Sequence, residues 1–169
     1  MDNVELVRMG TSDDTLANTF WRFYPAFLEN DVIMISRDTD SRLNMREKIA
    51  VDEWLASDKD FHIMRDHCCH RMRILAGMWG SKNNVLNPLA GALFNYIKPN
   101  VKFYDQIFLQ DVVYPVIKNN CIIHDSQQFY SDEKSHKFTT DADYFVGDCI
   151  LTADHAFKSL NKTEHQLAR

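Results

Sequence analysis

The sequence predicts an α/β fold in which helices flank a largely parallel β-sheet. Short apolar runs typical of buried strands alternate along the chain with segments whose apolar residues recur at helical spacing. Acidic residues and histidines directly follow three of the expected strands, where open α/β sheets bind ligands. The chain has 169 residues without a repeat or an obvious linker, which is enough for one domain with a substantial core.

The first part of the chain is expected to form two helices with a strand between them. Aromatic and apolar residues recur at helical spacing over 15–27, and the apolar run 32–36 is typical of a short buried strand. Asn44 can cap a helix over 45–56, because Glu47 stands three residues later as a capping-box partner.

Two further strands and a helix are expected next. The segments 61–64 and 74–79 are strand-like, and the second ends in small residues. Asn87 as a cap and Pro88 at the first helical position favour a helix that extends to about residue 97.

The last third is expected to contain a kinked helix, a short strand and a polar tail. Asp105 can cap a helix that continues to residue 118, although Pro115 should kink it. The run 121–123 is a short strand, and residues 154–169 are polar.

Asp38 and Asp40 follow the strand 32–36 with one residue between them. Alternate side chains of extended backbone point to the same side, so both carboxylates can meet just past the strand end. Two hard oxygen ligands suit Mg²⁺ or Mn²⁺, which proteins usually share with a phosphate. The alternative is a solvated turn, because this spacing is common in soluble proteins.

Other polar residues at the ends of elements also have two interpretations each. Asp66 could accept hydrogen bonds from sugar hydroxyls or close a strand-end turn. Asp105 or Gln106 could lie near a substrate, or Asp105 could only cap its helix. His124 could be a nitrogen ligand of the same metal or a structural histidine, and with Asp125 it also matches the H-D pair of metal phosphohydrolases.

The segment that begins with Ala76 and Gly77 is rich in small residues, which lets a substrate approach the backbone closely. A tight turn is the alternative, and the glycine spacing is not that of a P-loop. His62 is expected to be packed or on the surface, and His70 to face solvent.

Composition excludes several classes of function. The net charge is −5 without a basic stripe, which argues against nucleic-acid binding. No apolar run approaches the roughly 20 residues that span a bilayer, and the N-terminus lacks signal-peptide features, so we expect a cytoplasmic protein.

The four cysteines form no C-x-x-C pair, which favours reduced thiols over a structural zinc site. No nucleophile-elbow or dinucleotide motif is present.

Taken in order, these motifs resemble the nucleotide-sugar-dependent glycosyltransferases of GT-A fold. The matching segments are 20–23, 32–42 with its Asp-Thr-Asp-Ser-Arg, 46–47, 50–51, 53–54, 61–67, 76–80, 105–106 and 124–126. The likeness spans about residues 6–147 and is closest to the small glycosyltransferase domains of large algal, chlorella-type DNA viruses and some bacterial relatives. It implies a partial GT-A, Rossmann-like fold with a mixed, mostly parallel sheet and, for a viral protein, the host cytoplasm.

The resemblance implies a metal-dependent reaction on a UDP- or GDP-sugar. Asp38 and Asp40 would hold Mn²⁺ or Mg²⁺ on the donor diphosphate, with His124 as a third ligand, and Asp38 would also reach the sugar or ribose. The residues implied to lie against the donor sugar are Arg22, Asp66, Ala76 and Gly77.

The same resemblance places Asp105 and Gln106 on the side of the acceptor, which would be a glycan or a protein-linked group. If the reaction inverts the configuration of the sugar, a carboxylate base is needed, and Asp105 or Asp66 would be that base.

We therefore expect residues 1–153 to form a glycosyltransferase-like domain that lacks the N-terminal nucleotide-binding segment of the family, followed by the tail 154–169. The alternative is an inactive remnant, or a subunit whose partner chain supplies the missing half of the nucleotide site.

Overall fold

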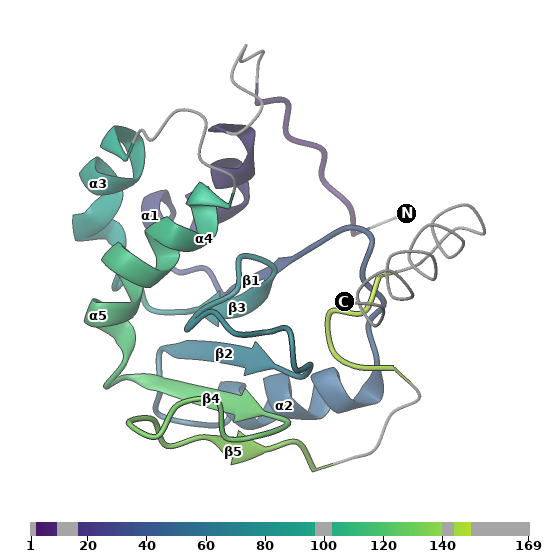
Figure 1. Ribbon diagram of the computed structural model, residues 1–169. Coiled ribbons are helices and arrows are strands. Elements are labelled where there is room, and N and C mark those ends of the chain that lie inside the picture. Colours follow the sequence, from purple (N-terminus) through teal and green to yellow (C-terminus); the bar gives the residue numbers. More distant parts are fainter. Residues whose placement is uncertain (1–2, 10–16, 97–102, 140–143, 150–169) are drawn as a thin grey trace, which may run out of the picture.

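The computed structural model describes residues 3–9, 17–96, 103–139 and 144–149. They form a mixed α/β structure in which helices flank an open five-stranded sheet of order β1-β3-β2-β4-β5 (Figure 1). The strands are β1 (Met34–Arg37), β2 (Phe61–Arg65), β3 (Met78–Ser81), β4 (Cys121–Asp125) and β5 (His136–Lys137). The predicted α/β class is confirmed at this level.

The sheet is less parallel than expected. β2, β4 and β5 pair in parallel, whereas β3 runs antiparallel to both of its neighbours, β1 and β2. The chain between β2 and β3 contains no helix. Parallel neighbours need a long crossover that is usually helical, so this connection instead returns the chain antiparallel. β1, β2 and β4 still run in the same direction, and their carboxyl ends share one edge of the sheet.

The helices are η1, a 3-10 helix (Ala17–Phe23), α1 (Tyr24–Leu28), α2 (Met45–Leu55), η2, a 3-10 turn (Asn87–Leu89), α3 (Ala90–Asn95), α4 (Tyr104–Phe108), η3, a π-helix (Leu109–Val113), and α5 (Tyr114–Ile117). No helix of the described residues is long and apolar enough to cross a membrane. The predicted tail 154–169 lies outside the described part of the chain.

The two faces of the sheet can be followed along β2. Phe61 and Ile63 join the larger apolar cluster, which the helices η1, α1, α3, α4, η3 and α5 also build. The alternate residues His62 and Met64 point to the other face, where His62 stacks on Trp54 of α2 and Met64 packs in a smaller cluster. This two-residue period is the pattern of a strand that is buried on both faces.

Proline explains two departures from the expected helices. Pro25 lies in the first turn of α1, so the predicted helix 15–27 is divided into a 3-10 segment and a short α-helix; residues 15 and 16 are not described. Pro115 lies in the first turn of α5 and donates no backbone hydrogen bond, and the π-helix η3 directly precedes that helix. The predicted helix 105–118 is therefore a succession of α-, π- and α-helical segments.

The helix starts were predicted with unequal success. Asn44 does cap α2, where its side chain accepts a hydrogen bond from the Glu47 amide at 2.8 Å. Asn87 does not cap, because the helical turn begins at Asn87 itself and its side chain donates to Asn30 instead. Asp105 is not a cap either, since the cap position of α4 is Phe103, in the left-handed region at φ 63°.

Candidate functional site

A cavity of about 390 Å³ opens at the carboxyl end of β1, between η1, the turn before β3 and the start of α4. Its lining residues are Thr19, Arg22, Asp38, His70, Leu75, Ala76, Gly77, Met78, Phe103, Tyr104, Asp105, Gln106 and Gly147. Six of the sequence-predicted site residues line this one cavity: Arg22, Asp38, Ala76, Gly77, Asp105 and Gln106. The fold therefore gathers positions that are up to 84 residues apart in the chain.

The end of β1 is fixed against the turn that precedes β3. The Ser36 hydroxyl donates to the Ala76 carbonyl at 2.6 Å, and the Arg37 guanidinium donates to the Gly77 carbonyl at 2.6 Å. Arg37 also pairs with Glu47 of α2 at 2.5 Å, so this arginine has a structural role. Burial raises the pKa of Glu47, and the Arg37 charge partly offsets that rise. These contacts set where the next residue, Asp38, leaves the strand.

Gly77 is needed for the position of Asp38. A Cβ atom on Gly77 would lie 2.3 Å from one Asp38 carboxylate oxygen, well inside van der Waals contact. The predicted small-residue segment thus leaves room for an acidic side chain, in addition to any room it leaves for a ligand.

Arg22 reaches the same carboxylate from η1. Its Nε donates to the Thr19 carbonyl at 3.2 Å, and its terminal nitrogen contacts Asp38 Oδ1. Both side chains remain partly accessible, with 30% of Arg22 and 49% of Asp38 exposed. One basic and one acidic group therefore stand at the cavity wall within reach of a ligand.

Asp40 lies outside the cavity lining, in the exposed turn that follows Asp38. The turn closes with a hydrogen bond from the Ser41 amide to the Asp38 carbonyl at 3.2 Å, and Ser41 forms a β-bridge with Cys149. Burial raises the pKa of the Cys149 thiol, and the negative charges of Asp40, Asp148 and Asp38 raise it further. We call Asp38, Asp40 and Asp148 the acidic rim. The sequence pattern does not identify Asp148, because this residue reaches the rim only through the pairing of Ser41 with Cys149, which are far apart in the sequence.

Asp105 and Gln106 come from the first turn of α4, and the Asp105 side chain is almost fully buried. Because Phe103 occupies the cap position, Asp105 is the second residue of the helix, and it lines the same cavity as Arg22 and Asp38.

Asp66 is not part of the cavity lining, contrary to the role expected for it. Its carboxylate accepts a hydrogen bond from the Val146 amide at 2.9 Å and pairs with Arg46 at 3.2 Å. Burial raises the pKa of Asp66, while Val146 and Arg46 oppose that rise. Asp66 therefore ties the end of β2 to α2 and to the segment 144–149.

His124 does not approach Asp38 and Asp40 either. It lies on β4, two strands beyond β3, which borders β1. Its Nδ1 is 2.9 Å from His62 Nε2, and its Nε2 is 2.9 Å from a Glu53 carboxylate oxygen. With both ring nitrogens engaged by protein groups, the structure gives no support to a metal-ligand role for His124.

His70 and Gly147 are cavity residues that sequence reasoning missed. His70 was expected to face solvent, but burial lowers its pKa to about 4, and its Nδ1 accepts the Asp66 amide at 3.1 Å. The neutral ring then carries its proton on Nε2. Gly147 has φ +86°, and a Cβ there would lie 2.8 Å from the Met78 sulfur. The D-H-x-x-H spacing was the only sequence signal for His70.

Comparisons of the chain with protein-family models, curated proteins and solved structures give no significant match. The arrangement of the residues themselves is therefore the basis for a functional proposal.

Proposed function

We propose that this chain is a metal-dependent glycosyltransferase domain that transfers a sugar from a nucleotide diphosphate sugar to a glycan or protein-linked acceptor. The observation that carries the proposal is the single cavity that gathers Arg22, Asp38, Ala76, Gly77, Asp105 and Gln106. The sequence resemblance implies donor-side and acceptor-side roles for these positions. Their convergence from four separate segments supports those roles.

The acidic rim fits a hard divalent cation. Asp38 and Asp40 offer carboxylate oxygens on an exposed turn, and their negative charges add to the effect of burial in raising the pKa of the Cys149 thiol. Mn²⁺ or Mg²⁺ would be held by Asp38 and Asp40, with Asp148 as a third acid nearby, and when bound would stabilise the leaving diphosphate.

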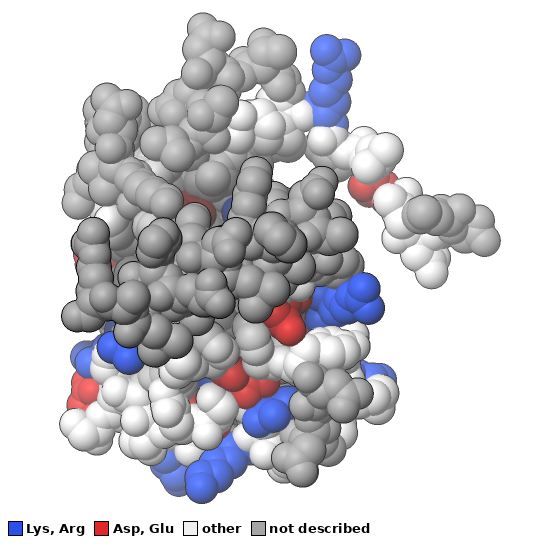
Figure 2. Space-filling model, turned by 45° about the vertical axis from the view of Figure 1, so that its right-hand side comes forward, with Lys and Arg blue, Asp and Glu red and all other residues white. Residues whose placement is uncertain are grey.

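The remaining residues would act on the two substrates. Arg22 would offer hydrogen bonds and positive charge to the donor, and the small residues Ala76 and Gly77 would let the sugar approach the backbone. Asp105 is the carboxylate nearest to the expected acceptor side, so it replaces Asp66 as the preferred base for an inverting reaction. On the face shown in Figure 2, acidic and basic side chains of the described residues are interspersed.

Calorimetric titration of UDP and of GDP, each with and without Mn²⁺, tests the proposal. We expect nucleotide binding that requires Mn²⁺, that is lost in Asp40→Ala and that persists in Asp52→Ala, a matched exposed acid on α2. Release of nucleotide from a panel of nucleotide sugars would then identify the donor. Absence of binding at millimolar UDP and GDP would reject a stand-alone enzyme.

A partner-dependent subunit is the second candidate, and one feature of the sheet favours it. β1 is an edge strand of the described sheet, with only β3 beside it, and Ile33 and Ile35 are exposed next to that edge. Unpaired strand edges are templates for a further strand. In this case the isolated chain would not bind nucleotide, and binding would appear only in complex with the partner.

A further inference from the structure

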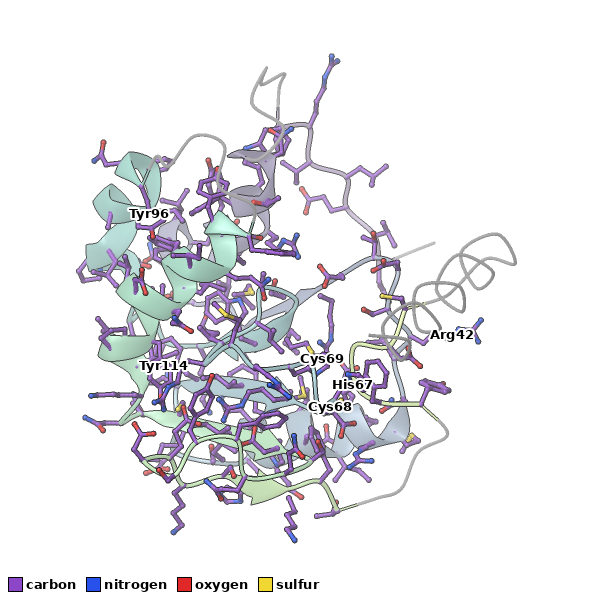
Figure 3. The ribbon with its side chains drawn as sticks, in the orientation of Figure 1. Arg42, His67, Cys68, Cys69, Tyr96 and Tyr114 are labelled. Atoms are coloured by element: carbon purple, nitrogen blue, oxygen red, sulfur yellow. The ribbon has the colours of Figure 1, made fainter. Side chains whose placement is uncertain are left out.

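The loop after β2 gathers two thiols and an imidazole outside the proposed catalytic site. The ligand atoms of His67, Cys68 and Cys69 all lie within 4.8 Å of one another, and among the described residues no other group of three histidine, cysteine or acidic side chains does so. Figure 3 shows the three side chains together beside the segment 144–149. Both cysteines are exposed and His67 is partly buried.

The backbone of this loop is held in a defined turn. The His70 amide donates to the His67 carbonyl at 2.8 Å, and the Arg71 amide donates to the Cys69 carbonyl at 2.9 Å. The His67 ring stacks on Phe145 with centroids 4.4 Å apart. A ligand would therefore meet a preformed turn and would have to order only the two short cysteine side chains.

The imidazole of His67 lies close to a cysteine sulfur. The Cys69 amide donates to His67 Nδ1 at 3.2 Å, and Cys68 Sγ lies 3.9 Å from Nε2. The neutral ring therefore has its lone pair on Nδ1, and a metal bound there would take the place of the Cys69 amide, whereas binding through Nε2 requires the proton to move to Nδ1. With metal–sulfur and metal–nitrogen bonds of about 2.3 and 2.0 Å, two ligands of a tetrahedral ion lie roughly 3.5 Å apart. Rotation of the exposed cysteine side chains can close that difference.

We propose that His67, Cys68 and Cys69 form an open, three-ligand site for a thiophilic metal ion of the Zn²⁺ type. Thiolate and imidazole are soft ligands that favour such ions over Mg²⁺ or Mn²⁺, which distinguishes this site from the acidic rim. Three protein ligands leave one position of a tetrahedral ion for water or another group. The site adjoins the cavity, because His70 lines the cavity and Phe145 belongs to the segment that carries Asp148.

Titration of the reduced full-length chain with Cd²⁺, followed by its thiolate charge-transfer absorption, tests the site directly. We expect one ion per chain and at least tenfold weaker binding in Cys68→Ser, in Cys69→Ser and in His67→Gln. Cys121→Ser is the matched control and should bind as the wild type does. Circular dichroism verifies that each variant is folded. We expect the cysteine variants to fold because Cys68 and Cys69 are exposed.

Zinc protection against alkylation is a second readout that needs no variant. Zn²⁺ should slow alkylation of Cys68 and Cys69, mapped by mass spectrometry. Unchanged alkylation of Cys68 and Cys69 at saturating Zn²⁺, or equal Cd²⁺ affinity of the wild type and the Cys68 and Cys69 variants, would overturn the proposal. Both readouts are independent of nucleotide binding, so they fail or succeed separately from the glycosyltransferase proposal.

Discussion

The carboxyl ends of β1 and β4 carry similar polar residues but use them in opposite ways. Asp38, just past β1, is half exposed at a cavity wall, and its carboxylate pairs with the partly exposed Arg22. Asp125, at the end of β4, is buried and forms two hydrogen bonds with the buried Arg65, at 2.7 and 2.9 Å. A position at the end of a strand is therefore compatible with either a binding group or a structural ion pair.

The difference lies in which neighbours the fold supplies. Arg65 meets Asp125 because parallel pairing of β2 with β4 places the two residues opposite each other, and Glu133 adds a second carboxylate. Arg73 pairs with the same Glu133. Charges that satisfy one another in this way hold the fold together, whereas the acidic rim keeps carboxylates accessible for a ligand.

Removing one acid from each region should separate the two roles most clearly. Asp125→Ala leaves the buried Arg65 without its bidentate partner, which we expect to cost about 3–5 kcal/mol in the free energy of unfolding. Asp38→Ala removes a partly exposed pair and should cost no more than about 1 kcal/mol. Urea-induced unfolding measures both values, and similar losses for the two variants would contradict the comparison.

The buried histidine pair should make the structural region sensitive to acid. Burial, together with the nearby His124 and Arg37, lowers the pKa of His62 well below 6.5. The unfolded chain then binds more protons, so stability falls as the pH decreases from about 6.5, by up to about 1.4 kcal/mol per pH unit. His62→Gln should flatten this dependence when unfolding is measured between pH 7.5 and lower values, since glutamine does not titrate.

His136→Gln, at an exposed position on β5, should change this dependence less than His62→Gln does, because the His136 charge only adds to the effect of burial in lowering the pKa of His124. Burial raises the pKa of Glu47, Asp66 and Asp125. The folded chain therefore binds more protons at these acids than the unfolded chain does, which raises the free energy of unfolding as the pH decreases. These acids are present in both variants, so only the difference between the two profiles reports His62. An unchanged slope in His62→Gln would show that the pair does not stay neutral in the folded chain.

Local features of this fold could be predicted from the sequence, whereas partners across the sheet could not. The Asn44 cap of α2 depends on residues three apart, and that spacing is visible in the sequence. The orientation of β3 depends on how the chain between β2 and β3 returns, and strand-like composition does not encode it. A ligand role for His124 is implied only by the resemblance, and a structural role is the alternative. Its contacts with His62 and Glu53, which are 62 and 71 residues away, leave no local signal that would decide between them.

The candidate site shows the same limit. Six of its predicted positions converge on one cavity. Asp38, Asp105 and Gln106 lie at the ends of elements that the pattern predicts, whereas Arg22 falls inside the predicted helix 15–27. Ala76 and Gly77 fall inside the predicted strand 74–79, but β3 begins only at Met78. Asp66 did not join them, since the Val146 amide and Arg46 occupy its carboxylate. Asp148 and His70 were missed because their place at the site depends on pairing of the segment 144–149 and on a turn after β2.

A pair of glycine substitutions tests whether the position of the Asp38 carboxylate matters for ligand binding. In Gly77→Ala, the new Cβ would lie 2.3 Å from Asp38 Oδ2 and must displace that carboxylate from the cavity wall. We expect Mn²⁺-dependent nucleotide affinity to fall at least tenfold, measured by the same calorimetric titration. The stability loss should be smaller than for Asp125→Ala, because a half-exposed side chain can move away.

Gly91→Ala is the control, because a Cβ at Gly91 meets no atom within 4 Å. In the helix α3 alanine should stabilise the fold by about 0.5–1 kcal/mol and leave nucleotide binding unchanged. If both substitutions left binding intact, the position of Asp38 would not matter for the ligand, and the acidic side chain at the end of β1 would be as structural as the one at the end of β4.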